Sequence, residues 1–156
     1  MEELAQGLGK ERFDAVGSSF AIYYSKNIDK TVSDIHEVLK EEGRTFVCGP
    51  TEGNNKELAD LHAKVAPLPN KFIEHTQFMA NTALPTFKKH FRTVKTSIFK
   101  NPIRFPNKRA MLDYWNSYTL FNERAKGKFD SLLDEYFDKE SVFVTHKVVL
   151  GILAKK

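Results

Sequence analysis

The stretch of sequence that decides the fold opens with Phe13-Asp14-Ala15-Val16-Gly17-Ser18-Ser19 and closes with Arg44-Thr45-Phe46-Val47-Cys48. Both runs are short and consist largely of small or apolar residues, which is typical of strands buried on both faces of a sheet. A helical pattern lies between them, and a strand, a helix and a strand in about 35 residues make a βαβ unit. The crossover of such a unit is right-handed. We therefore expect Ala15 and Phe46 to lie on neighbouring strands that run in the same direction.

The helix between the two strands has an apolar face at helical spacing. Val32, Ile35, His36 and Leu39 recur at that spacing. Asp29 is expected to cap the amino end, because a carboxylate there accepts hydrogen bonds from free backbone amides. Gly43 is expected to end the helix.

The remaining chain alternates helical and strand-like patterns. We expect a helix from Asn54 or Asn55 to Ala66, a helix over 71–83 that Pro85 bends, an edge strand over 93–100, a loop marked by Pro102 and Pro106, a helix capped by Asn107, a helix over 129–137 and a final strand over 142–154. This order predicts an α/β fold. Its parallel strands are followed by two strands that pair antiparallel at the end of the chain.

Composition suits a globular protein. Hydrophobic residues make up 41% of the chain and charged residues 28%. No apolar run approaches the roughly 20 residues that cross a bilayer, so we expect no membrane association. The acidic start of the sequence does not resemble a signal peptide.

Cys48 is the single cysteine and is expected to be buried. Without a possible internal disulfide, a reducing, cytoplasmic setting fits best.

Positive charge is concentrated between His75 and Leu112, where no Asp or Glu occurs. The stretch carries eight cations: Lys88, Lys89, Arg92, Lys95, Lys100, Arg104, Lys108 and Arg109. It is either a surface for anionic substrates or nucleic acid, or a solvated face whose phenylalanines turn inward. Because nothing in it matches a nucleic-acid-binding module, we do not expect a nucleic-acid partner.

Several segments together resemble class I S-adenosylmethionine-dependent methyltransferases. These segments are Phe13-Asp14-Ala15-Val16, the helix end Val38-Leu39-Lys40-Glu41-Glu42-Gly43-Arg44 and the last strand Val148–Lys156. The resemblance covers nearly the whole chain and implies a partial Rossmann-like methyltransferase sheet with inserted helices. It describes 1–156 as a single domain, the C-terminal part of that fold, with helical segments 54–92 and 107–140 over the sheet and pocket.

Two departures from the family pattern affect this interpretation. Glu41-Glu42 stand where the family usually has proline and glycine. The family's glycine loop, an acidic residue followed by G-x-G-x-G after the first strand, is missing, because Gly7 and Gly9 follow no strand. If the resemblance holds, the first three strands are expected upstream of Met1.

The resemblance also implies S-adenosylmethionine as cofactor and a small-molecule methyl acceptor. The expected cofactor-binding residues are Glu2, Ser18, Ser19, Phe20 and Ala21. The expected substrate-binding residues are Tyr24, Pro50, Thr51, Tyr114 and Trp115.

Each of these assignments has a structural alternative. The two serines could instead form a turn that bonds its own backbone, and Tyr24 could be a packing residue. The stripe that contains Tyr114 and Trp115 could be core instead of a lid.

The sequence shows neither a metal site nor a catalytic residue. The five histidines, at 36, 62, 75, 90 and 146, have no metal-ligand spacing. No nucleophile elbow or phosphate loop is present. A non-catalytic module that oligomerises through an open sheet edge is the alternative to a methyltransferase.

Overall fold

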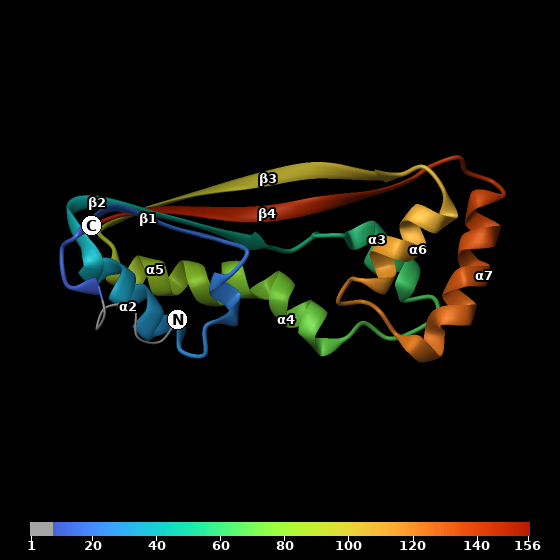
Figure 1. Cartoon of the computed structure of the whole chain (residues 1–156), viewed down its shortest axis with the longest axis horizontal. Helices are drawn as coiled ribbons and strands as arrows, with labels where there is room; N and C mark the ends of the chain where they lie inside the picture. Colours follow the sequence, from blue (N-terminus) through green and yellow to red (C-terminus); the bar gives the residue numbers. More distant parts are fainter. Residues whose placement is uncertain (1–7) are drawn as a thin grey trace. The chain divides into compact units, whose positions relative to one another are not determined.

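The computed structural model describes residues 8–156 and places four strands in one sheet (Figure 1). In chain order the elements are β1 (Phe13–Ser19), η1 (Ile22–Tyr24), α2 (Ile28–Val38), β2 (Leu39–Pro50), α3 (Lys56–His62), α4 (Asn70–Phe78), η2 (Met79–Ala83), α5 (Leu84–His90), β3 (Thr93–Phe105), α6 (Lys108–Asn116), η3 (Glu123–Ala125), α7 (Lys126–Phe137) and β4 (Phe143–Lys155). The strand order is β1-β2-β4-β3. The α/β prediction is therefore confirmed.

The chain divides into two compact units, and each is described by itself. Unit 1 comprises Met1–Glu52, His75–Phe99 and Val149–Lys156, and unit 2 comprises Gly53–Glu74 and Lys100–Val148. β3 and β4 each pass from one unit to the other.

The βαβ unit is present as the sequence predicts. β1 pairs parallel with β2, and Ala15 lies opposite Arg44 while Gly17 lies opposite Phe46. β4 pairs antiparallel with the other side of β2, where Phe46 lies opposite Leu153. The neighbouring, same-direction strands on which the fold assignment depends are thus confirmed.

The helix between these strands begins earlier than predicted. Asn27 is the N-cap of α2, and its side chain accepts a hydrogen bond from the Lys30 amide. The prediction that Asp29 caps the helix is wrong, because its carboxylate accepts hydrogen bonds from Lys89 and His90 instead. Asp29 still lies in the first turn, where negative charge is favourable.

Gly43 does not end the helix. α2 ends at Val38, and Gly43 lies within β2. A Cβ on this glycine would lie 2.7 Å from the Lys40 carbonyl oxygen, so the backbone leaves no room for a side chain. Glu42, directly before it, has φ of +65°. Glu42 and Gly43, in the segment where the sequence predicts the helix to end, therefore belong to an irregular first part of β2.

The helices of unit 1 cover one face of its sheet only (Figure 1). α2 and α5 pack against Val47, Leu150, Ile152 and Ala154. β1 lies at the edge of the sheet, and Ala15, Gly17 and Ser19 are exposed. The prediction that β1 is buried on both faces is therefore wrong, because no described segment covers its second face. Cys48 is buried, as predicted.

β3 lies at the opposite edge of the sheet, which confirms the edge position predicted for it. The loop predicted at Pro102 and Pro106 is wrong in part, since β3 continues through Pro102 to Phe105. Proline is tolerated in an edge strand because its missing amide would otherwise point to solvent.

The helical segments differ from prediction mainly at their ends. α3 ends at His62 instead of Ala66. Ahead of Pro85, the long helix changes into the π-helical turn η2, and α5 then starts with that proline in its first turn. No described helix is both long and apolar enough to cross a membrane.

Unit 2 has its own core around α6. Asn107 caps α6 as predicted, because its side chain accepts a hydrogen bond from the Ala110 amide. Met111 and Trp115 are fully buried, together with Phe129 and Leu133 of α7.

Candidate functional site

The parallel strands β1 and β2 end side by side. Ser19 lies opposite Cys48, and the Phe20 amide donates a hydrogen bond of 2.9 Å to the Cys48 carbonyl. In open α/β sheets, ligands bind outside the carboxyl ends of the parallel strands. Five of the predicted site positions lie at this edge or follow it directly: Ser18, Ser19, Phe20, Pro50 and Thr51.

The turn after β1 is made by Phe20 in an unusual conformation. Its φ is +52°, in the left-handed region that bulky side chains rarely adopt. The ring is not buried, since 44% of its surface is exposed. An exposed aromatic side chain on a strained turn at a strand end is a feature that packing does not explain, and such strain is concentrated at functional sites. Ala21 follows and leads into η1.

The two serines before this turn have different surroundings. Ser19 Oγ lies 3.4 Å from the Cys48 sulfur, so it contacts β2. Ser18 Oγ is buried and makes no hydrogen bond within the described part of the chain. In the described part of the chain, neither hydroxyl forms the hydrogen bond to its own backbone that the alternative interpretation requires.

Aromatic side chains gather next to the same strand ends. The Tyr23 ring lies 4.6 Å from the Tyr24 ring and 4.9 Å from the His75 ring, between centroids. A Cβ on Gly49 would meet Met79 at 3.0 Å and Tyr23 at 3.4 Å, which shows how closely these side chains pack on the end of β2. Tyr24 remains 64% exposed and can contact a ligand.

The end of β2 is more enclosed. Pro50 is buried, and Thr51 has 5% of its surface exposed. Glu2, the remaining predicted cofactor residue, lies outside the described residues.

The two substrate positions predicted in α6 belong to unit 2 and differ from each other. Trp115 has no exposed surface; its indole Nε1 donates to His62 Nδ1 at 3.2 Å, and its ring stacks on Phe129 at 4.3 Å. Burial lowers the pKa of His62, which keeps this imidazole neutral and able to accept. Tyr114 is partly exposed, and its hydroxyl accepts a hydrogen bond from Asn55. Of the two, only Tyr114 offers surface to a ligand in this structure.

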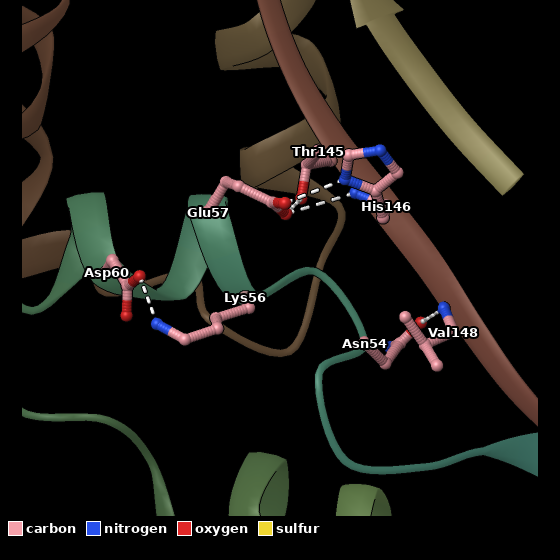
Figure 2. Close-up of polar contacts among 7 residues, drawn as sticks. All are labelled: Asn54, Lys56, Glu57, Asp60, Thr145, His146 and Val148. Carbon is pink, nitrogen blue, oxygen red and sulfur yellow. Dashed lines mark hydrogen bonds and ion pairs between the residues drawn. The ribbon is translucent and has the colours of Figure 1, made fainter. Parts of the chain in front are cut away.

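One polar cluster in unit 2 was missed by the sequence reasoning. Glu57, in the first turn of α3, accepts hydrogen bonds from His146 Nδ1 at 2.7 Å and from Thr145 Oγ1 at 3.0 Å, as Figure 2 shows. Nearby, the Asn54 side chain accepts from the Val148 amide. These contacts fasten the start of α3 to β4. Neither a motif nor a spacing signals them, because the partners lie about 90 positions apart.

A second polar group adjoins this cluster. Asn55 donates to the Tyr114 hydroxyl and Asn54 to the Tyr118 hydroxyl. The Lys147 ammonium lies 4.8 Å from the centre of the Tyr118 ring, a cation–π contact. Burial lowers the pKa of Lys147. Like the Glu57 cluster, this group holds unit 2 together.

Within the described residues, no group of three or more His, Cys, Asp or Glu side chains could hold a metal ion.

Solved structures of known proteins share the fold. The YcgJ protein of Bacillus subtilis is 14% identical, with a TM-score of 0.55 over 94% of this chain and 65% of that one. A proposed methyltransferase of Bacillus halodurans C-125 is 15% identical, with a TM-score of 0.54 over 94% of this chain and 71% of that one. The chain thus spans about two thirds of the length of these proteins. Its fold is that of part of a class I methyltransferase.

No protein-family model and no curated protein sequence matches this sequence.

Proposed function

We propose that this chain provides the C-terminal portion of an S-adenosylmethionine-dependent methyltransferase that acts on a small molecule. The fold supports methyl transfer as the reaction class. The observation that carries the proposal is the turn after β1, where Phe20 has φ of +52° beside the end of a parallel strand. A fold of this class uses that edge for its ligand.

The residues at this edge fit the methionine part of such a cofactor. Ser18 has a buried hydroxyl without a partner, and Ser19 and Phe20 present polar and aromatic surface. We assign these residues and Ala21 to cofactor binding, and we retain Glu2 as a position for the adenine side. Tyr24, Pro50 and Thr51 remain the proposed acceptor positions in unit 1, and Tyr114 the one in unit 2; Trp115 is not retained, because its side chain is fully buried in the core of unit 2.

Methyl transfer from a sulfonium requires little catalytic chemistry from the protein's side chains. When bound, the cofactor supplies an electrophilic methyl group on a sulfonium, and the acceptor's lone pair displaces the thioether. Rate then depends on holding the two reacting atoms in line, about 3–3.5 Å apart, and on excluding water. A strained, hydrogen-bonded turn and a packed aromatic group provide such rigid positioning. A general base is not required for an acceptor that is already nucleophilic, with its lone pair free.

Titration calorimetry with S-adenosylmethionine and S-adenosylhomocysteine tests the proposal. The 1–156 chain should bind weakly or not at all, because the glycine loop is missing from it. A longer natural product that contains that loop should bind both compounds, and Phe20→Ala in it should weaken binding at least fivefold. Ile98→Ala, which alters an exposed residue of β3, is the control. A longer product that binds neither compound would refute the proposal.

A second function is favoured by one observation, the open edge at β1. An unpaired strand edge is a template for another chain. In this alternative the chain is a non-catalytic module that assembles with its own copies through β1. Sedimentation velocity separates the two candidates, because self-association that depends on β1 occurs only in the second.

A further inference from the structure

Lys147 of β4 carries a positive charge that no carboxylate balances within the described part of the chain. Its side chain is half-buried, and its ammonium lies 5.3 Å from the centre of the Tyr114 ring and 4.8 Å from that of the Tyr118 ring. Glu57, the carboxylate of the neighbouring cluster, is occupied by His146. The cation of Lys147 is therefore held against two aromatic rings without a counter-charge.

The two rings compensate only part of the lost hydration of this cation. An ammonium has three N–H donors, and among residues 8–156 none of those of Lys147 donates to an oxygen atom. A ring face attracts the charge but is a weak hydrogen-bond acceptor. Burial accordingly lowers the pKa of Lys147. An oxygen ligand with negative charge would supply what the ammonium lacks.

The same two rings carry hydroxyl groups that can donate to such a ligand. The Tyr114 hydroxyl accepts a hydrogen bond from Asn55 Nδ2 at 2.9 Å, and the Tyr118 hydroxyl accepts one from Asn54 Nδ2 at 3.1 Å. A tyrosine hydroxyl both accepts and donates, so each can still donate its own proton. Burial raises the pKa of both tyrosines, which keeps the two protons in place at neutral pH.

The asparagines that position these hydroxyls are fixed in turn by the backbone of β4. Asn54 Oδ1 accepts from the Val148 amide at 3.1 Å, as Figure 2 shows, and the Asn55 amide donates to the His146 carbonyl at 2.7 Å. The backbone of Asn55 has φ of +53°, a left-handed conformation in which asparagine is enriched. The two hydroxyls are thus held in position before a ligand binds, which reduces the entropy lost on binding.

Asn55 also leaves one polar atom unsatisfied at this place. Its side chain is fully buried, and its Oδ1 accepts no hydrogen bond within the described part of the chain. The amide that carries this oxygen bonds to the Tyr114 hydroxyl, so the oxygen belongs to the same cluster. A buried polar atom without a partner is costly, and packing alone does not account for it.

We infer that Lys147, Tyr114 and Tyr118 form an oxyanion-binding site in unit 2, which holds the carboxylate or phosphate group of the methyl acceptor. One ammonium and two hydroxyl donors match the oxygens of such a group, and hydrogen bonds to an ionised group are stronger than neutral ones. The assignment to the methyl acceptor rests on the proposed function. The binding of the anion does not, because all three residues lie in unit 2.

The first test is a titration of the ¹⁵N-labelled 1–156 chain followed by ¹H–¹⁵N nuclear magnetic resonance. Sodium phosphate and sodium acetate are added in separate arms, and sodium chloride at equal ionic strength is the blank. The amide signals of Asn55, Tyr118 and Lys147 should shift and saturate with at least one of the two oxyanions. Saturation with phosphate alone or with acetate alone identifies the group on the ligand. Shifts that do not saturate, or that chloride reproduces, would overturn the inference.

The second test repeats the titration on variants. Lys147→Met keeps an unbranched side chain without the charge and should raise the Kd of the bound anion about tenfold. Tyr118→Phe keeps the ring and its contact with Lys147 but loses the hydroxyl, and should raise the Kd about fivefold. The matched control is Lys139→Met, which removes an exposed lysine of the same unit and should leave the Kd unchanged.

The variants also define the results that would overturn the inference. An unchanged Kd in Lys147→Met, or an equal rise in Lys139→Met, would mean that the anion responds to overall charge and not to this site. If Lys147→Met does not fold, Tyr118→Phe decides, and an unchanged Kd in it would refute the site. Neither titration requires S-adenosylmethionine, so a failure of the cofactor to bind in calorimetry would refute only the proposed function.

Discussion

Glu57 and His146 form the shortest polar contact between α3 and β4, with 2.7 Å between Oε1 and Nδ1. Burial alone would raise the pKa of the Glu57 carboxyl, but hydrogen bonds from its own backbone amide, from His146 and from Thr145 lower it to about 2. The charged form of Glu57 is therefore favoured in the folded state. This links the stability of unit 2 to pH.

The sign follows from the lowered pKa. A carboxyl whose folded pKa lies below its unfolded value of 4.5 contributes stability above that pH, and the contribution is lost as pH falls toward 2. Because the Glu57 side chain is 40% exposed, solvent reduces the effect to about 1 kcal/mol. Glu57→Gln should therefore lower the unfolding free energy by about that amount at pH 6, and by much less at pH 2.5.

Urea denaturation followed by the fluorescence of Trp115 measures this difference, because Trp115 is the single tryptophan and lies in unit 2. Asp60→Asn is the control. It removes another carboxylate of α3, in an exposed pair with Lys56 that contributes little. A Glu57→Gln effect that is the same at pH 6 and pH 2.5 would contradict the linkage.

The strained turn at Phe20 gives a second prediction. Glycine adopts a φ of +52° without the steric cost that other residues incur, about 1 kcal/mol. Phe20→Gly should therefore be more stable than Phe20→Ala by about that amount. Both variants lose the same aromatic ring, so their difference isolates the backbone. Chemical denaturation of both variants provides the comparison, and equal midpoints would mean that the turn relaxes in solution.

Sequence patterns located the elements better than their surroundings. The apolar run 13–19 correctly predicted β1, but a local pattern does not reveal whether a neighbouring layer covers the strand. Asn27 and Asp29 are both good caps, and the choice depended on Lys89 and His90, far along the chain. Hydrophobic periodicity predicts which residues lie on one face of a helix or strand. It does not predict which segment of the chain packs against that face.

The candidate site was predictable to a similar degree. The sequence predicts a loop at Ser18-Ser19-Phe20-Ala21 after the first strand, whereas Ser18 and Ser19 still belong to β1 and the turn is made at Phe20. The sequence did not indicate the positive φ of Phe20, because phenylalanine does not favour that backbone conformation. Glu57 and His146 were missed because their contact depends on how α3 meets β4.

Trp115 supports a third prediction, which concerns its structural role in unit 2. Trp115→Ala should reduce the unfolding free energy by about 3–5 kcal/mol, because it empties a fully buried site and leaves His62 Nδ1 without its donor. Circular dichroism during thermal denaturation measures the loss. Phe121→Ala, which removes a partly exposed ring beside Trp115, should cost clearly less. A Trp115→Ala variant of unchanged stability would show that the indole is not part of the core.

Two glycines with opposite surroundings give the last prediction. A Cβ on Gly43 would lie 2.7 Å from the backbone oxygen of Lys40, which cannot move without disturbing β2. Gly127 lies in α7, and a Cβ there would meet nothing within 4 Å. Gly43→Ala should therefore destabilise the protein by more than about 1 kcal/mol. Gly127→Ala should stabilise it by about 0.5–1 kcal/mol, because alanine loses less conformational freedom in a helix. Urea midpoints of the two variants should shift in opposite directions, and shifts of the same sign would show that the backbone at Gly43 adjusts to a side chain.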